Sequence, residues 1–304
     1  MAEAIRGTFA SKAGAELETR LWQADGEPRG IVQLVHGMAE HIDRYDETAK
    51  RLNAAGYTVV GHNQLGHGEK AEVKGYFADQ EGWDAVLSDV HTLRTQQQAA
   101  GLPYFLLGHS MGSFVVRTYC LEHEKGLAGV VLSGTGHFAA PIVTAGSVVA
   151  AVQCAFGMAK KPSKLIDKLN FSANNKCFEN PRTAFDWLTR NEEHVDRYVA
   201  DPHCGFVFTA GGYRDLFRGL KRLYPNRIDT MDKTVPVLLL SGDHDPVGGN
   251  GAGVKLVAQE LKAAGVAAVT VKLYEGGRHE IFNEINSEEV CADLIAWLNR
   301  VGTK

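Results

Sequence analysis

The chain has 304 residues, of which 44% are hydrophobic and 22% are charged, and its formal net charge is -4. This length and composition predict one large domain with a full hydrophobic core and room for an insertion. The small negative charge and the lack of a long basic run exclude a nucleic-acid surface, because such a surface needs clustered Lys and Arg. Small molecules or lipids are the partners that we expect.

The N-terminal segment, MAEAIRGTFASKAG, lacks the apolar stretch of a signal peptide, and no part of the chain offers about 18 uninterrupted apolar residues. The cysteines show no C-x-x-C spacing that could hold zinc or form a redox pair. They are scattered at Cys120, Cys154, Cys177, Cys204 and Cys291. We therefore expect a cytoplasmic protein with free thiols.

Alternating apolar and polar residues in IRGTFA (5–10) and LETRLWQ (17–23) predict an antiparallel hairpin at the edge of a sheet. Further along, apolar runs alternate with helix-patterned stretches, and most of these runs end in glycine or a polar turn. Because several are apolar at nearly every position, both of their faces should be buried. The expected fold class is α/β, with a mostly parallel central sheet flanked by helices. The runs are 31–37, 57–63, 104–110, 129–136, 235–242 and 268–277.

The alternation breaks between residues 137 and 212, where helical patterns at 180–190 and 191–200 follow one another without a strand. This predicts a helical cap, 137–212, inserted into a core formed by 1–136 and 213–304. The segment 143–159 is mostly apolar but short, and we expect a helix packed on the core. The alternative is that it presents apolar surface to a lipid aggregate.

The sequence YFLLGHSMGSFVVRTYCLEH places Gly108-His109-Ser110-Met111-Gly112 between an apolar strand and an amphipathic helix. This G-x-S-x-G pattern is typical of a nucleophile elbow, in which a tight turn lifts the serine above the sheet at the positive end of a helix. An inert serine in an ordinary turn is the alternative. The strand before the motif and the helix after it favour Ser110 as a nucleophile.

A serine nucleophile needs a histidine base oriented by a carboxylate, and on such a fold the order is serine, acid, histidine. His279 alone follows the last predicted strand, so we expect it to be the base. Four other histidines follow Ser110 but precede the candidate acid, namely His123, His137, His194 and His203. The acid should lie in SGDHDPV, after the strand 235–242, and a helical run at 253–265 separates it from His279.

Acyl transfer also needs two backbone N–H groups that hold the oxyanion. Met111, which follows the serine, supplies one of them. The second is expected from Met38 in LVHGMAEHIDRY, where His36 and Gly37 end a strand. A plain turn is the alternative for this His-Gly pair.

Five segments together resemble the monoacylglycerol lipase and lysophospholipase branch of the α/β-hydrolase superfamily, and they span nearly the whole core. These segments are HGMAEHIDRY, NQLGHGEK, LLGHSMGS, SGDHDPV and YEGGRHEIFNE. The family block HG-x-x-EH-x-x-RY matches at His36, Gly37, Glu40, His41, Arg44 and Tyr45. The family also has an element D-x-x-GHG-x-S, from which this sequence departs twice. Asn63 replaces the acid, and Lys70 replaces the small hydroxyl residue. These positions are usually structural in relatives, so the departure concerns local hydrogen bonding.

The resemblance also separates the two aspartates of SGDHDPV. Family acids follow a strand-ending glycine by three residues, which is the spacing from Gly242 to Asp245. Asp243 lies closer to the strand end and is expected to bond backbone amides. A metal site at Asp243, His244 and Asp245 is disfavoured because no second ligand motif lies nearby.

The resemblance implies a serine hydrolase that cleaves lipid esters with one long acyl chain under a mobile helical cap, whose residues in 137–212 form the substrate site. It implies no metal or organic cofactor, and only transient contact with a membrane or micelle surface. One alternative is a serine aminopeptidase of the proline iminopeptidase type, whose cap carboxylates bind a free amino terminus. A short-chain carboxylesterase and a noncatalytic ligand-binding homologue are the others.

Two cap features have plainer interpretations. The acidic residues Glu192, Glu193 and Asp196 lie at helical spacing and are expected to form a solvated face near a helix start. Cys204 is expected to be a small buried residue without a catalytic role.

Overall fold

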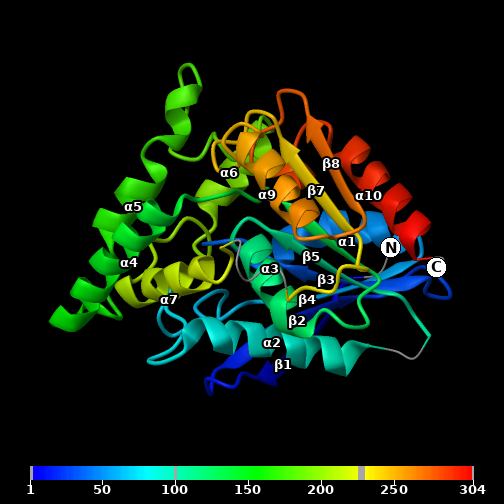
Figure 1. Cartoon of the computed structure of the whole chain (residues 1–304), viewed down its shortest axis with the longest axis horizontal. Helices are drawn as coiled ribbons and strands as arrows, with labels where there is room; N and C mark the ends of the chain where they lie inside the picture. The colour runs from blue at the N-terminus through cyan, green and yellow to red at the C-terminus, as the bar shows by residue number, and fades with distance from the viewer. Residues whose placement is uncertain (1–2, 99–100, 225–229, 303–304) are drawn as a thin grey trace.

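A computed structural model describes residues 3–98, 101–224 and 230–302. Its centre is an eight-stranded sheet in the order β1-β2-β4-β3-β5-β6-β7-β8 (Figure 1). The pairs β1–β2 and β2–β4 are antiparallel, and every other neighbouring pair is parallel. The edge hairpin and the six apolar strands are therefore confirmed. The strands are β1 (Ile5–Ala10), β2 (Glu16–Trp22), β3 (Gly30–Val35), β4 (Tyr57–His62), β5 (Tyr104–His109), β6 (Gly129–Ser133), β7 (Val237–Gly242) and β8 (Val269–Tyr274).

Helices cover both faces of the sheet. As a result, every residue of β3, β5, β6 and β7 is buried. Successive residues of a strand point to opposite faces. Leu106 of β5 accordingly belongs to the core cluster that includes residues of α2, α3 and α9, whereas Leu107 belongs to the cluster that includes residues of α1 and α10. This confirms the α/β-hydrolase architecture. The covering helices are α1 (Asp46–Ala54), α2 (Gly82–Gln97), α3 (Met111–His123), α9 (Ala252–Ala263) and α10 (Ser287–Val301).

Between β6 and β7 the chain forms a mainly helical segment at one end of the molecule (Figure 1). There α7 contacts α2 and α3, and α4 packs against α7. The expected boundary after residue 212 falls inside α7, which begins beyond its N-cap Thr209. The helices here are α4 (Ala140–Gln153), η2 (Cys154–Met158), α5 (Lys164–Phe171), η3 (Asn174–Cys177), α6 (Glu192–Ala200) and α7 (Ala210–Lys221); two short helices elsewhere are η1 (Ile42–Tyr45) and η4 (Ile281–Asn283).

The helix expected over 180–190 is wrong, because this stretch consists of turns and bends. The carboxylate of Asp186 accepts hydrogen bonds from the backbone N–H groups of Arg182 and Thr183 and from the Thr183 hydroxyl. Side-chain acceptors that satisfy local backbone donors compete with helix formation. The helix expected over 191–200 is confirmed as α6.

The expectation that 143–159 packs on the core is correct for one face of α4 only. Only Val143 and Ala150 of α4 are buried, and Phe156 in η2 is 83% exposed. Within the described residues, Ala140–Met158 is the one helical segment long and apolar enough to span a membrane by length and composition alone, and 11% of it is buried. One face of α4 packs on α7, and the other is apolar and open.

Candidate active site

Ser110 lies in the sharp turn between β5 and α3, with φ 50° and ψ -119°. A non-glycine residue in such a sparsely populated conformation costs about 1–3 kcal/mol and persists only where its surroundings enforce it. The two flanking glycines make the turn possible. A Cβ on Gly112 would lie 2.0 Å from the carbonyl oxygen of Val35, and one on Gly108 would lie 2.3 Å from that of Gly112. The G-x-S-x-G spacing therefore produces a strained turn with a half-exposed serine.

His279 and Asp245 meet at the ends of β8 and β7. The Nδ1 atom of His279 lies 3.0 Å from Oδ1 of Asp245, and both side chains are buried. The backbone N–H of Val247 donates to Oδ1 at 2.9 Å, and the Ser241 hydroxyl donates to Oδ2 at 3.2 Å. These bonds fix the carboxylate toward the imidazole.

Burial by itself would lower the pKa of His279, but the charge of Asp245 and its hydrogen bond outweigh burial and raise it. Burial lowers the pKa of the neighbouring His109 to about 3, with a further contribution from His279. The two rings lie 4.8 Å apart between centroids. At neutral pH His109 is therefore uncharged, and His279 is the imidazole that can carry a proton.

Asp243 and His244 do not join this pair. Asp243 accepts a hydrogen bond from the backbone N–H of Gly276 at 2.8 Å and contacts His244 Nδ1 at 2.6 Å. The His244 side chain is 60% exposed. Asp243 and His244 thus contact each other, whereas the Asp245 carboxylate faces His279.

A cavity of about 570 Å³ lies between the sheet and the helical segment 137–212. Ser110, His279, Met38 and Met111 all line it, so the structure brings together every expected site residue except Asp245, which lies behind His279. The rest of the wall is largely apolar. It includes Phe138, Val143, Phe171, Leu216, Phe217 and Leu220.

The loop that carries Met38 is held by Glu40. Its Oε1 accepts hydrogen bonds from the backbone N–H of Gly37 at 2.5 Å and from the Tyr45 hydroxyl at 2.9 Å. Burial raises the pKa of Glu40, although the charge of Arg44 opposes this. The Glu40 carboxylate thus orders the turn that carries Met38, which lines the cavity.

Arg44 connects this loop to the histidine loop, a role that the sequence analysis missed. Its guanidinium donates to Glu40 Oε2 at 2.6 Å and to both oxygens of Glu280, at 2.7 and 2.6 Å. Burial would raise the pKa of Glu280, but Arg44 holds it at about 2. The sequence did contain a signal for this contact, since Arg44 belongs to the matched HG-x-x-EH-x-x-RY block and Glu280 follows the candidate base.

The turn segment 180–190 holds the histidine loop from the other side, which sequence patterning also missed. The Trp187 ring lies 5.1 Å from the His279 ring, and the Glu280 N–H donates to the Leu188 carbonyl at 2.7 Å. Arg190 forms an ion pair with Glu284 at 2.9 Å. A segment distant in sequence therefore positions the imidazole.

The competing histidines lie elsewhere. Among the described residues that line the cavity, the histidines are His109 and His279. His123 stacks on His91, and His137 contacts Glu260. The remaining two, His194 and His203, lie near Glu47 and His41 respectively.

The two departures from the family block form local contacts. Asn63 accepts a hydrogen bond from the Ile42 N–H at 2.8 Å and donates to Glu18 at 3.0 Å. Lys70 pairs with Glu16 at the surface. Asn63 thus connects the candidate oxyanion loop region with the edge hairpin.

Comparisons with known proteins identify the family of the chain. Residues 26–286 match the family model described as "Serine aminopeptidase, S33". A monoacylglycerol lipase of Mycolicibacterium smegmatis is 32% identical over 96% of this chain and 95% of that protein, and the human monoglyceride lipase is 28% identical over 94% and 88%. A thermostable carboxyl esterase from Bacillus coagulans, solved with glycerol, superimposes with a TM-score of 0.91 at 29% identity, over 99% of both chains. The chain belongs to this family of α/β-hydrolases, in the branch that contains the monoacylglycerol lipases.

Proposed function

We propose that this protein is a serine hydrolase that cleaves lipid esters with a single acyl chain, with Ser110 as nucleophile, His279 as general base and acid, and Asp245 as orienting acid. The observation that carries the proposal is the shared cavity. Ser110, His279 and the two candidate oxyanion donors all line it, and Asp245 bonds His279 from behind. The monoacylglycerol lipase relatives support the ester chemistry.

In this mechanism His279 takes the proton of Ser110 as the serine attacks the ester carbonyl. The backbone N–H groups of Met38 and Met111 hold the negative oxygen of the tetrahedral intermediate. His279 then protonates the departing alcohol. Water, activated by the same imidazole, hydrolyses the acyl-enzyme and releases the fatty acid.

The cavity favours one long acyl chain. Its volume of about 570 Å³ is within the roughly 300–1,000 Å³ of small-molecule sites. Many of the side chains that line it are apolar. Those from α4, α5 and α7 include Val143, Phe171, Leu216, Phe217 and Leu220. Burial of an alkyl chain against them contributes about 0.8 kcal/mol per CH₂ group.

The cavity carboxylates argue against an aminopeptidase. Glu40 and Glu280 are both paired with Arg44, and Asp167 accepts a hydrogen bond from the Tyr213 hydroxyl at 3.1 Å. The acidic residues Glu192, Glu193 and Asp196 are exposed on α6 and do not line the cavity. Among the described residues that line the cavity, two of the three carboxylates are thus neutralised by Arg44, and Asp167 already accepts a hydrogen bond.

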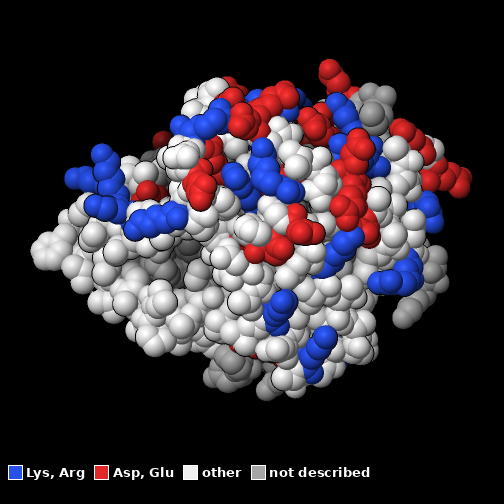
Figure 2. Space-filling model, turned by 90° about the horizontal axis from the view of Figure 1, so that it is seen from above, with Lys and Arg blue, Asp and Glu red and all other residues white. Residues whose placement is uncertain are grey.

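We include in the proposal that residues 137–212 act as a cap that touches lipid surfaces transiently. Seven large apolar side chains of this segment are at least half exposed, namely Ile142, Val148, Val152, Phe156, Leu165, Leu169 and Val199. Figure 2 shows a broad surface without charged side chains at this end of the molecule, bordered on one side by Lys and Arg. Its exposed lysines lie in and near α5, at Lys161, Lys164 and Lys168.

We further propose a cytoplasmic location. All five cysteines, which lie within the described residues, are free thiols. Free thiols are typical of reducing compartments, where disulfides are rare.

A hydrolysis panel tests the function. Purified protein is assayed on monoacylglycerols and lysophospholipids across acyl lengths, on a short soluble ester and on an amino-acid anilide. We expect the highest kcat/KM on a long-chain, single-acyl ester. A preference for the anilide would favour the aminopeptidase, a preference for the short ester would favour a general carboxylesterase, and failure of a fluorophosphonate probe to label Ser110 would indicate a noncatalytic homologue.

A further inference from the structure

A second group of reactive side chains lies outside the cavity, where the loop after α6 meets the loop after β3. Among the described residues, His41, Asp201 and Cys204 form the one group of three metal-binding side chains whose donor atoms all lie within 4.8 Å of one another. The His41 Nε2 and Asp201 Oδ2 atoms are 2.8 Å apart. Neither the mechanism above nor the matched sequence blocks gives Asp201 and Cys204 a role.

The local chain path explains why these atoms converge. The sequence Asp201-Pro202-His203-Cys204 folds into a turn in which the Cys204 N–H donates to the Asp201 carbonyl at 3.1 Å. This turn places the carboxylate and the thiol toward the same neighbour. That neighbour, His41, extends from the loop that also carries Met38.

From this geometry we propose that His41 Nε2, Asp201 Oδ2 and Cys204 Sγ bind a zinc ion. Imidazole nitrogen, carboxylate oxygen and thiolate sulfur are the donor types that zinc takes in proteins. The fourth position falls to His203 or to water. The His203 ring lies 6.3 Å from that of His41, and its Nδ1 is buried without a hydrogen-bond partner among the described atoms.

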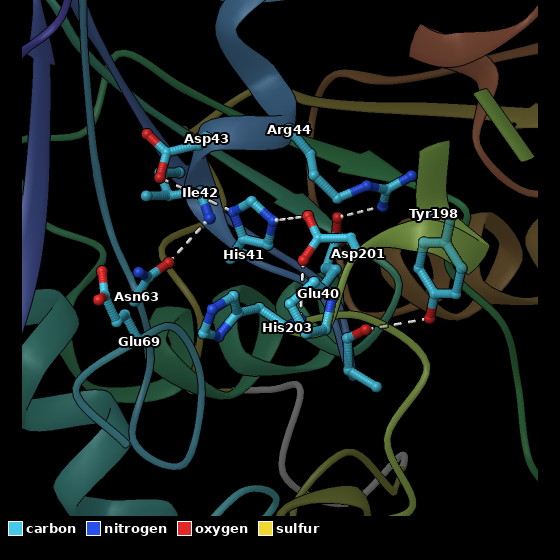
Figure 3. Close-up of polar contacts among 12 residues, drawn as sticks. Glu40, His41, Ile42, Asp43, Arg44, Asn63, Glu69, Tyr198, Asp201 and His203 are labelled. Carbon is cyan, nitrogen blue, oxygen red and sulfur yellow. Dashed lines mark hydrogen bonds and ion pairs between the residues drawn. The ribbon is translucent and has the colours of Figure 1, made fainter. Parts of the chain in front are cut away.

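The surroundings provide the outer contacts that zinc ligands need. A zinc-bound histidine commonly directs its second ring nitrogen to a carboxylate. Figure 3 shows the His41 imidazole between Asp43 and Asp201, and Nδ1 of His41 is 3.8 Å from Asp43 Oδ2. Arg20 holds Asp43 through bonds of 2.5 and 2.8 Å.

The second oxygen of Asp201 is also held, since the His203 backbone N–H donates to Oδ1 at 2.7 Å. Only Oδ2 of this carboxylate faces His41. Two of the three ligands are therefore oriented before an ion arrives.

The three side chains are buried to different degrees. Cys204 is 9% exposed, whereas the side chains of His41 and Asp201 are 14% and 28% exposed, which leaves an entry path on the carboxylate side. The nearby cation Arg44 is already paired with Glu40 and Glu280. Zinc binds the thiolate, so each ion bound releases the thiol proton to solvent.

Zinc at this site would fasten the oxyanion loop to the segment after α6. Ala39, which follows Met38, already accepts hydrogen bonds from the Gly205 N–H at 2.9 Å and from the Tyr198 hydroxyl at 3.0 Å. Coordination by His41, two residues after Ala39, and by Cys204, which precedes Gly205, would restrict this loop further. The three zinc ligands are distinct from the proposed catalytic residues Ser110, His279 and Asp245.

Cobalt(II) titration of the purified full-length chain, without an affinity tag, tests the proposal. A bound cobalt ion with a cysteine ligand shows thiolate-to-metal charge-transfer absorption in the near ultraviolet. We expect this band in the wild type and its removal by an equivalent of zinc. The band should be absent from Cys204→Ala and unchanged in Cys291→Ala, which removes a buried thiol on α10. Absence of the band from the wild type, or its persistence in Cys204→Ala, would overturn the proposal.

Two further variants keep all three zinc ligands, so they test the site even if Cys204→Ala fails to fold. Asp43→Asn keeps every ligand and should weaken zinc affinity about 10- to 100-fold, the effect of losing an outer carboxylate; unchanged affinity contradicts the proposed His41 contact. Ser110→Ala should bind cobalt as the wild type does. The zinc site and the hydrolase assignment can therefore fail separately, since one is measured by absorption and the other by ester cleavage.

Discussion

The Arg44 guanidinium donates hydrogen bonds to both carboxylate oxygens of Glu280, at 2.7 and 2.6 Å, although 236 positions separate the two residues. Glu280 adjoins His279, and the same guanidinium reaches Glu40, which bonds the N–H of Gly37. One arginine thus connects the loop of the candidate base to the loop of a candidate oxyanion donor. All three charged side chains are largely buried.

Replacing Arg44 with Met should destabilise the protein by about 3–5 kcal/mol, because it leaves two buried carboxylates without their cation. Arg44→Lys should keep most of the free energy of unfolding, because the positive charge remains. It should still lower kcat, since one ammonium group cannot reproduce the forked contact with Glu280 and Glu40. Urea unfolding and short-ester kinetics measure the two effects. Equal kcat for Arg44→Lys and wild type would show that the network is not needed to position either loop.

Ser110→Ala should lower kcat by roughly four to six orders of magnitude, because the remaining oxyanion donors and binding contacts give only residual catalysis. Labelling by a fluorophosphonate should be lost as well. Ser113→Ala is the matched control, since Ser113 lies one turn into α3 and its hydroxyl donates to the Ser110 carbonyl. A loss of activity under tenfold in Ser110→Ala refutes the nucleophile.

The pH profile of kcat/KM should report His279. The imidazole acts as a base only when neutral, and its pKa is raised above the ordinary value of about 6.5. Activity should therefore fall as pH decreases, with a midpoint above 6.5. Asp245→Asn should lower kcat by about 10⁴ and move the midpoint to lower pH, because the charge that raises the pKa is gone.

Asp243→Asn is the control for this pair. Its carboxylate bonds the Gly276 N–H and His244 rather than His279, so activity should stay close to that of the wild type. If Asp243→Asn is the more damaging change, Asp245 is not the orienting acid.

Asp89 should make stability depend on pH. Burial raises the pKa of Asp89 to about 7, although the hydroxyl of Ser11 donates to it at 2.8 Å. In the unfolded chain an aspartate titrates near 3.9, so the stability contributed by the protonated folded form is lost as pH rises from about 4 to 7. Asp89→Asn should remove this pH dependence. The free energy of unfolding of the wild type should therefore fall relative to that of the variant as pH rises over that range. Urea midpoints at pH 5 and 8 measure it; a constant difference contradicts the prediction, and Asp25→Asn, on an exposed loop, controls for charge.

Val152→Asp should reduce hydrolysis of aggregated monoacylglycerol while leaving a short soluble ester unaffected. Val152 is 50% exposed on α4, and a carboxylate there opposes contact with an apolar surface. Ile285→Asp, at a residue that is 65% exposed outside the helical segment, is the control. Equal loss on both substrates would indicate damage to the cavity rather than to a lipid-binding face.

Periodicity predicted the strands because burial on both faces leaves a continuous apolar run, as in β5 and β7. It failed at 180–190, where the Asp186 carboxylate satisfies backbone donors locally and produces turns. It could not decide that the outer face of α4 is exposed, because an apolar helix has the same pattern whether that face meets the core or solvent.

Chain order and the G-x-S-x-G spacing were sufficient to bring Ser110 and His279 to one site, because a short turn and a strand end place side chains through local geometry. Their catalytic roles are predictions. The spacing of Asp245 from Gly242 selected the acid in the same way, although its role is still a prediction. The Arg44 network, the Trp187 contact and the meeting of His41 with Asp201 and Cys204 needed the tertiary structure. Each joins segments far apart in the chain, and only packing of the helical segment against the sheet sets the distances on which their charges and donor atoms depend.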